Sequence, residues 1–112
     1  MEIVHRTNRD STVIEIAGPF AFSNRKDFTA ALDAVKRTHS RHVILNLARV
    51  TFVDSSAIGL LALTAQQMKS SATRFSLVGA QGTVKQVLEL MQIHRMIPMY
   101  ANEDAALDKH AA

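Results

Sequence analysis

The stretch Val50-Thr-Phe-Val-Asp-Ser-Ser-Ala-Ile-Gly-Leu-Leu-Ala-Leu-Thr64 joins an apolar run to an amphipathic one through three small polar residues. Apolar residues then recur at helical spacing, which predicts a chain that leaves a sheet and enters a helix ending near Ser70. The polar residues Asp54, Ser55 and Ser56 stand at the first turn of that helix. The predicted buried face comprises Ile58, Leu61, Ala62, Ala65 and Met68, and the predicted outer face carries Thr64, Gln67 and Ser71.

Aspartate and serine are common at a helix start because their side chains cap the first N–H groups. One cap is enough, yet this helix start carries a carboxylate and two hydroxyls. A spare serine would lie beside unpaired N–H donors at the positive end of the helix dipole, where a phosphate is tolerated. The triplet is therefore either a plain cap or a hydroxyl that can be phosphorylated reversibly without unfolding its helix.

The rest of the chain alternates strand and helix signals. Strands are predicted at residues 3–7 and 12–17 with a turn between them, at 43–47, at 74–79 and at 97–100, the last an edge strand because of its proline. Helices are predicted from a cap at Asn24 to about Thr38, after a capping box formed by Thr83 and Gln86, and after a cap at Asn102 with Leu107 as its anchor. This order predicts an α/β fold: a mostly parallel mixed β-sheet with an N-terminal β-hairpin and four α-helices, and residues 43–47 at its centre.

Two aromatic residues, Phe20 and Phe22, follow a Gly18-Pro19 pair that predicts the end of the second strand. Either both aromatics are core residues, or one is a contact residue at the surface. In a mainly parallel sheet, the carboxyl ends of the strands and the helix starts after them carry the functional surface. The segment from Asp54 to Ser56 lies at such a position.

Length and composition limit the class of protein. The 112 residues suffice for one domain with one core, which we take as residues 1–112. The chain has no cysteine, which excludes disulfides and thiolate chemistry. Its first residues lack the order of a secretory signal, and the apolar run at 57–63 is too short for a membrane span. We therefore expect a cytoplasmic protein without membrane insertion.

The formal net charge of +3 is weak evidence for nucleic-acid binding, because the 13 basic residues are scattered and only residues 36–42 form a cluster. Cations at the end of a helix complement its dipole. One tyrosine and no tryptophan leave little for bases to stack on. We therefore expect no nucleic-acid partner.

The sequence carries no recognisable catalytic motif. Its four glycines form no phosphate-binding loop. Ser55 and Ser56 lack the leading glycine of a serine-hydrolase elbow, although Asp54 and a histidine could complete a triad in space. His39 and His42 have acceptable ligand spacing, but no third ligand is marked. We predict no enzyme, metal or cofactor, and keep a small serine hydrolase as a remote alternative.

Over nearly its whole length the chain resembles a STAS domain, the fold of bacterial anti-sigma factor antagonists, also called anti-anti-sigma factors. The resemblance rests on the opening hairpin, Gly18 followed by Phe20, the strand at 43–47 and above all Phe52-Val-Asp-Ser-Ser-Ala-Ile-Gly59. The last segment is similar to the family signature Asp-Ser-Ser/Thr-Gly-aliphatic-Gly, in which the hydroxyl residue directly after the aspartate is the phosphoacceptor. The resemblance implies Ser55 in that role, with Ser56 in reserve.

The resemblance also implies partners and a mechanism of partner switching. The unphosphorylated protein would bind an anti-sigma factor kinase of the histidine-kinase-like ATPase type and so free a sigma factor for transcription. Phosphorylation would break this complex, and a serine phosphatase would restore it. The implied partner-binding residues are Phe20, Ala21, Phe22, Asp54, Ser55, Ser56, Ala57 and Gly59.

Three positions depart from the family pattern. Ala57 stands where many phosphorylated members have glycine, Ala21 where many antagonists have aspartate, and Gln92 where a glycine is common after the third helix. The family also includes scaffold proteins and the STAS subunits of ABC-type lipid transport systems. A subunit of that kind, without phosphorylation, is the main alternative to the switch.

Overall fold

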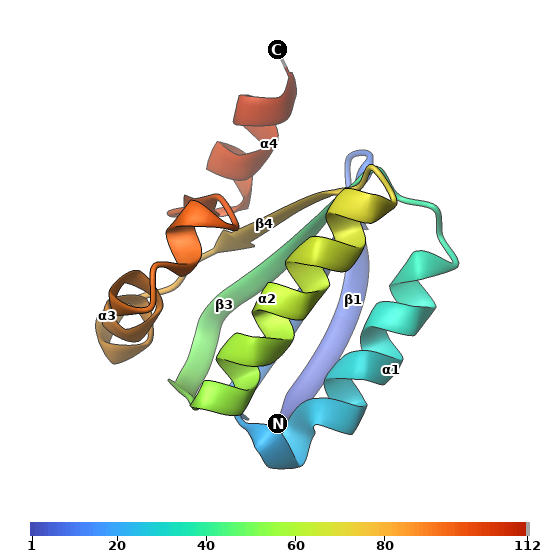
Figure 1. The fold of residues 1–112 in the computed structure, drawn as a ribbon. Helices are drawn as coiled ribbons and strands as arrows, with labels where there is room; N and C mark the ends of the chain where they lie inside the picture. The colour runs from blue at the N-terminus through green and yellow to red at the C-terminus, as the bar shows by residue number, and fades with distance from the viewer. Residues whose placement is uncertain (112) are drawn as a thin grey trace.

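The computed structural model describes residues 1–111, with side chains described as far as Leu107. These residues form a five-stranded sheet in the order β1-β2-β3-β4-β5, packed against helices (Figure 1). The strands are β1 (Glu2–Asn8), β2 (Ser11–Phe20), β3 (His42–Val53), β4 (Arg74–Val78) and β5 (Met99–Tyr100), and the α-helices are α1 (Arg25–Lys36), α2 (Ser55–Ser70), α3 (Gly82–Leu90) and α4 (Glu103–Ala111). β1 pairs antiparallel with β2, and each later pair is parallel. The predicted fold class is confirmed.

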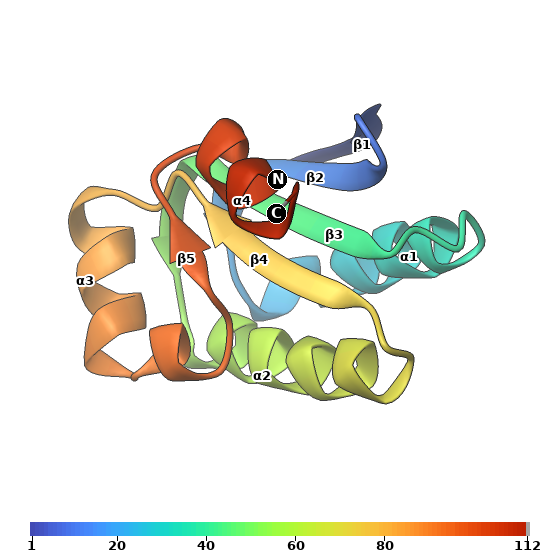
Figure 2. The same ribbon diagram turned by 90° about the horizontal axis from the view of Figure 1, so that it is seen from above.

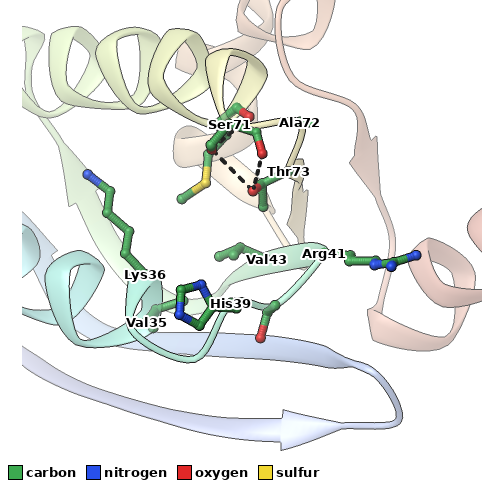
Figure 3. A pocket seen from close by; sticks show the side chains of 10 residues that line it. Val35, Lys36, His39, Arg41, Val43, Ser71, Ala72 and Thr73 are labelled. Carbon is green, nitrogen blue, oxygen red and sulfur yellow. Dashed lines mark hydrogen bonds between the residues drawn. The ribbon is translucent and has the colours of Figure 1, made fainter.

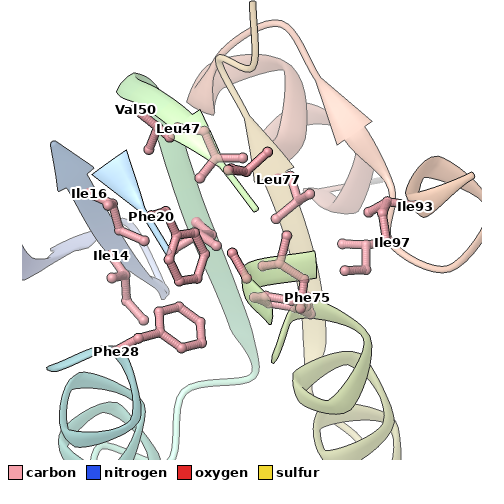
Figure 4. Packing of buried hydrophobic residues seen from close by; sticks show 14 of the residues in the cluster. Ile14, Ile16, Phe20, Phe28, Leu47, Val50, Phe75, Leu77, Ile93 and Ile97 are labelled. Carbon is pink, nitrogen blue, oxygen red and sulfur yellow. The ribbon is translucent and has the colours of Figure 1, made fainter. Parts of the chain in front are cut away.

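The two faces of the sheet are covered differently. α1 and α2 lie on one face, and α4 lies on the other (Figure 2). The larger core lies under α1, α2 and α3, where the rings of Phe20 and Phe28 pack with their centroids 4.9 Å apart (Figure 4). The smaller cluster under α4 comprises Val13, Ile44, Val78, Ala106 and Leu107. Successive side chains of a strand point to opposite faces of the sheet, so the same strands contribute residues to both clusters.

β3 lies at the centre of the sheet, as predicted, but it continues past the predicted end at Leu47 to Val53. The exposed residues Ala48 and Arg49 interrupt the apolar pattern without ending the strand. β5 lies at the sheet edge, as predicted, and it begins only after Pro98. The central strand therefore extends directly to the start of α2.

β2 also runs further than the sequence predicts. The pairing with β3 shifts register between Glu15 and Ala17 and again between Gly18 and Pro19. Such bulges bend a strand without ending it, so the strand end predicted at Gly18-Pro19 is wrong. β2 continues to Phe20, which pairs with Val53 in β3. The ends of the two strands thus lie side by side, and the chain after β2 begins next to the start of α2.

Two of the predicted helix starts differ in the structure. α3 begins at Gly82 after Gln81 and has no side-chain cap, so the capping box predicted from Thr83 is wrong. Asn24 precedes α1 as predicted, but it makes no side-chain cap bond to that helix. Its Oδ1 instead accepts a hydrogen bond from the N–H of Ala21 at 3.1 Å. The asparagine therefore closes the 3-10 turn Phe22–Asn24.

The outer face of α2 also differs from the prediction. Thr64 is buried, and its hydroxyl donates to the carbonyl oxygen of Leu60 at 2.7 Å. Leu63, by contrast, is 51% exposed. Position 64 lies on the same helical stripe as the buried Ala57 and Leu61, and the bond to the preceding turn satisfies its hydroxyl.

α4 begins as predicted, with Asn102 Oδ1 accepting from the N–H of Ala105 at 2.9 Å. A polar cluster then ties the helix to the sheet. The Glu103 carboxylate accepts hydrogen bonds from Arg6 at 2.5 Å. It also accepts from the side-chain amides of Asn8 at 2.9 Å and Asn46 at 2.8 Å.

Burial acts to raise the pKa of the Glu103 carboxyl. The hydrogen bonds from Arg6, Asn8 and Asn46 outweigh that effect and leave the pKa below its ordinary value. The charged form of Glu103 is therefore the form that holds α4 on the sheet.

We expect Glu103→Ala to lower the free energy of unfolding by about 1–3 kcal/mol, because partly buried donors lose their acceptor. The folded-state pKa of Glu103 lies below the unfolded one, so its contribution is fully present above the unfolded pKa and is lost as pH falls through the folded pKa. Urea unfolding at neutral and acid pH measures both effects. Asp104→Ala, at an exposed site in the same helical turn, is the control. An equal loss in both variants would contradict the role of Glu103.

Candidate functional site at the start of α2

Asp54 caps α2 and also holds the loop that follows β2. Its Oδ1 accepts from the N–H of Ala57 at 2.8 Å, and its Oδ2 accepts from the N–H of Phe22 at 3.0 Å. Its own N–H donates to the carbonyl oxygen of Phe20 at 3.4 Å. The bonds from Ala57 and Phe22 hold the pKa of the Asp54 carboxyl below its ordinary value. One ionised side chain thus joins the ends of two strands to the start of a helix.

The two serines occupy the first two positions of α2, directly after this cap. Ser55 is exposed and Ser56 is half-buried. The side-chain cap bond comes from Asp54, so the helix does not depend on the Ser55 hydroxyl for its cap. That hydroxyl is accessible beside the positive end of the helix dipole.

The two aromatic residues after the Gly-Pro pair have different roles. Phe20 is fully buried and packs on Phe28, whereas Phe22 is 54% exposed. The guanidinium of Arg25 lies over the Phe22 ring, 3.9 Å from its centroid, and donates to the Phe22 carbonyl oxygen at 3.2 Å. Arg25 is a site residue that was not predicted from the sequence, where its three-residue spacing from an aromatic residue was the available signal.

Two of the eight residues implied to bind a partner have fully buried side chains. Phe20 and Ala57 position the site, and their side chains do not reach its surface. The Ala57 methyl therefore does not obstruct a partner's approach. Ala21 is half-buried, and Gly59 is exposed. Gln92, the third departure from the family pattern, has a φ of +59°, a conformation that favours glycine.

Leu63 was assigned to neither face of α2 by the sequence analysis. It follows Ser55 and Gly59 at intervals of four residues, and all three are exposed. A Cβ built on Gly59 would have no atom within 4 Å apart from its chain neighbours and the backbone of its own helix. The three residues therefore form an uncharged stripe along α2 with an open gap between the serine and the leucine.

The described residues do not form a Ser-His-Asp triad at this site. Both carboxylate oxygens of Asp54 accept backbone hydrogen bonds, and no hydrogen bond joins Ser55 or Ser56 to a histidine in this part of the chain. The buried His42 lies at the other end of β3, where its ring bonds to Ser76 at 2.8 Å. The arrangement is that of a helix cap.

Within residues 1–107, no three His, Cys, Asp or Glu side chains gather closely enough to hold a metal ion. Among the described helices, none has the length and apolar character needed to cross a membrane.

Comparison with known proteins now identifies the family. The STAS domain model matches residues 2–106, so the chain belongs to the STAS domain family. A STAS-domain-containing protein of Pseudomonas aeruginosa (strain UCBPP-PA14) is 30% identical over 83 residues, which cover 74% of this chain and 81% of the relative. An anti-sigma F factor antagonist of Paenibacillus polymyxa is 24% identical over 75 residues, which cover 67% of this chain and 64% of the relative.

Solved structures share the fold. The anti-sigma factor antagonist SpoIIAA in its unphosphorylated form superposes with a TM-score of 0.80 at 22% identity, covering 98% of this chain and 96% of that one. A sulfate transporter family protein from Wolinella succinogenes superposes with a TM-score of 0.78 at 20% identity, covering 93% and 87%. The same fold thus occurs in an antagonist and in a transporter family protein.

We expect Asp54→Ala to lower the melting temperature and to speed hydrogen exchange at the N–H groups of Ala57 and Phe22. Asp54→Asn keeps an acceptor oxygen and should have a smaller effect. The folded-state pKa of Asp54 is lowered, so its contribution is present above the unfolded pKa and is lost as pH falls through the folded pKa. NMR measures hydrogen exchange at these N–H groups. The control is Asp33→Ala, a variant at an exposed site. Unchanged exchange at Phe22 would refute the link between the cap and the loop.

Proposed function

We propose that this protein is an anti-sigma factor antagonist whose binding is switched by phosphorylation of Ser55. The observation that carries the proposal is an exposed Ser55 hydroxyl on a helix whose cap is made by Asp54. A kinase can reach this hydroxyl, and the helix keeps its cap when the hydroxyl is modified. Ser56 is half-buried and is the less accessible of the two serines.

Charge explains how a phosphate would act here. It adds about −1.5 to −2 charge at neutral pH, next to the ionised carboxylate of Asp54. At an interface this charge brings repulsion and a desolvation cost, whereas the helix start tolerates it within the fold. Phosphorylation would therefore break a complex while the folded protein stays intact.

The surface around Ser55 has the character of a protein interface. Phe22 and Leu63 are each about half exposed, and they lie on the two elements joined by Asp54. Aromatic side chains are enriched in protein interfaces, and exposed apolar side chains that lie together mark sites of protein contact. We assign this surface, made by Phe22, Ser55, Gly59 and Leu63, to the cytoplasmic partner, an anti-sigma factor kinase of the histidine-kinase-like ATPase type. A serine phosphatase would reset the switch.

The likeness to the Paenibacillus polymyxa antagonist supports this proposal. The likeness to the Wolinella succinogenes transporter family protein supports a second candidate, a STAS subunit that stays bound to a transport system without phosphorylation. Phosphorylation of Ser55 distinguishes the two candidates.

We expect incubation with the cognate anti-sigma factor kinase and ATP to place one phosphate on Ser55, as mapped by mass spectrometry of peptides. Ser55→Ala should abolish the modification, and Ser56→Ala should leave it. Ser55→Asp should weaken the complex with the kinase at least about tenfold, which corresponds to roughly 1.4 kcal/mol. Ser55→Ala should bind like the wild type.

The melting temperatures of these serine variants should stay close to that of the wild type, because Asp54 provides the cap. Absence of phosphate from both serines would favour the permanently bound subunit. Equal binding by Ser55→Asp and Ser55→Ala would contradict the switch.

We expect Leu63→Glu to weaken binding of the same kinase at least about tenfold, because it places an unpaired charge in the interface. Leu90→Glu is the matched control, since Leu90 is 81% exposed and lies on α3. Isothermal titration calorimetry with both variants measures the difference. Equal affinities would exclude the outer stripe of α2 from the interface.

A further inference from the structure

A second concave site lies at the opposite end of α2 from Ser55. It is formed by the C-terminal ends of α1 and α2 and by the connections that follow them (Figure 3). The cavity has a volume of about 500 Å³. Sites for small molecules typically measure about 300–1,000 Å³, so the cavity has the size of a ligand site. It lies at the amino end of β3 and shares no residue with the surface around Ser55.

The floor of this cavity is apolar. Val35, Val43 and Met68 line it, and all three belong to the larger core. They come from α1, β3 and α2. The gap between the two helix ends reaches down to the end of the core, where these side chains are 1–3% exposed and leave a small apolar surface for a ligand.

The rim of the cavity is basic. Lys36, His39 and Arg41 line it, and no aspartate or glutamate does. Lys36 and His39 come from the end of α1 and the connection after it, and Arg41 follows with its guanidinium pointing away from them (Figure 3). Lys36 Nζ donates to the neutral Oε1 of Gln67 at 3.2 Å, a contact that leaves its charge uncompensated. The cavity therefore favours a negatively charged group.

Basic residues at a helix end often serve only to offset its terminal carbonyl groups. Here other donors already bind those carbonyls. The Val35 carbonyl oxygen accepts from the Thr38 N–H at 3.0 Å and from its hydroxyl at 2.6 Å. The Met68 carbonyl oxygen accepts from the N–H groups of Ser71 at 3.2 Å and Thr73 at 2.8 Å. The basic side chains are therefore not needed as caps.

We propose that this cavity binds a small organic anion. Its carboxylate or phosphate group lies between Lys36 and His39, and its apolar body covers the floor. An inorganic anion would leave the floor bare, and a neutral molecule would not use the basic rim. The site does not depend on the phosphorylation of Ser55.

The test is an NMR titration of the ¹⁵N-labelled protein with benzoate and with phenyl phosphate. We expect saturable shifts in the backbone amides of residues 36–41 and 68–73. Benzyl alcohol, which lacks the charge, and inorganic phosphate, which lacks the apolar body, should bind at least about tenfold more weakly. Lys36→Glu should weaken benzoate binding at least about tenfold, and Lys85→Glu, the same charge change on α3, should alter it by less than about twofold.

Both lysines are exposed, so both variants should fold like the wild type. Three results would each overturn the proposal: binding of benzyl alcohol as tight as that of benzoate, an affinity unchanged by Lys36→Glu, or no saturation by either probe. Shifts centred on residues 54–57 would also overturn it, because they would place the anion at the start of α2.

Discussion

The site depends on the two hydrogen bonds that Asp54 accepts through its two carboxylate oxygens. One holds the first turn of α2, and the other holds the loop after β2. Each acceptor is charged and each donor is a backbone N–H, which makes these bonds stronger than neutral ones. Without them, the exposed Phe22 and the exposed Ser55 would lie on segments that could move independently. With them, the two residues belong to one surface.

This arrangement needs the long central strand and the bulged β2 beside it. The bulges bring Phe20 next to Val53, so β2 and β3 end side by side at the same end of the sheet. The packing of Phe20 on Phe28 then anchors the end of β2 in the core. At the opposite end of these strands, the C-terminal ends of α1 and α2 and the connections after them form a basic cavity. α2 therefore has a different site at each end. Its start carries the exposed surface around Ser55, and its C-terminal end borders the basic cavity.

The sequence predicted the strand and helix order because apolar periodicity follows from the layers that each element contacts. It also placed the helix start and its cap within residues 54–56, since small polar residues before an apolar run are a local signal, but it did not decide which of the three is the cap. It missed features that depend on distant partners. The course of β2 through Gly18-Pro19 requires the register of β3, and the loop after β2 is held by a bond from the N–H of Phe22 to Asp54, which lies far along the chain.

The same distinction applies within the site. Whether Phe20 or Phe22 is buried could not be decided from a two-residue spacing, because the answer depends on where β2 ends. The burial of Thr64 could not be read from its polarity, since a bond to the preceding turn satisfies its hydroxyl. The basic cavity joins residues 35–43 to residues 68–73, and no local pattern indicates that these segments meet.

The central claim is that the start of α2 accepts a phosphate on Ser55 without any change of fold. Phosphoserine introduced at position 55 by an expanded genetic code, in ¹⁵N-labelled protein, tests this without a kinase. We predict amide shift changes confined to residues 21–24 and 54–59, with the remaining spectrum and the thermal transition nearly unchanged. Changes that spread through β3 and α4, or a loss of the cooperative transition, would contradict the account.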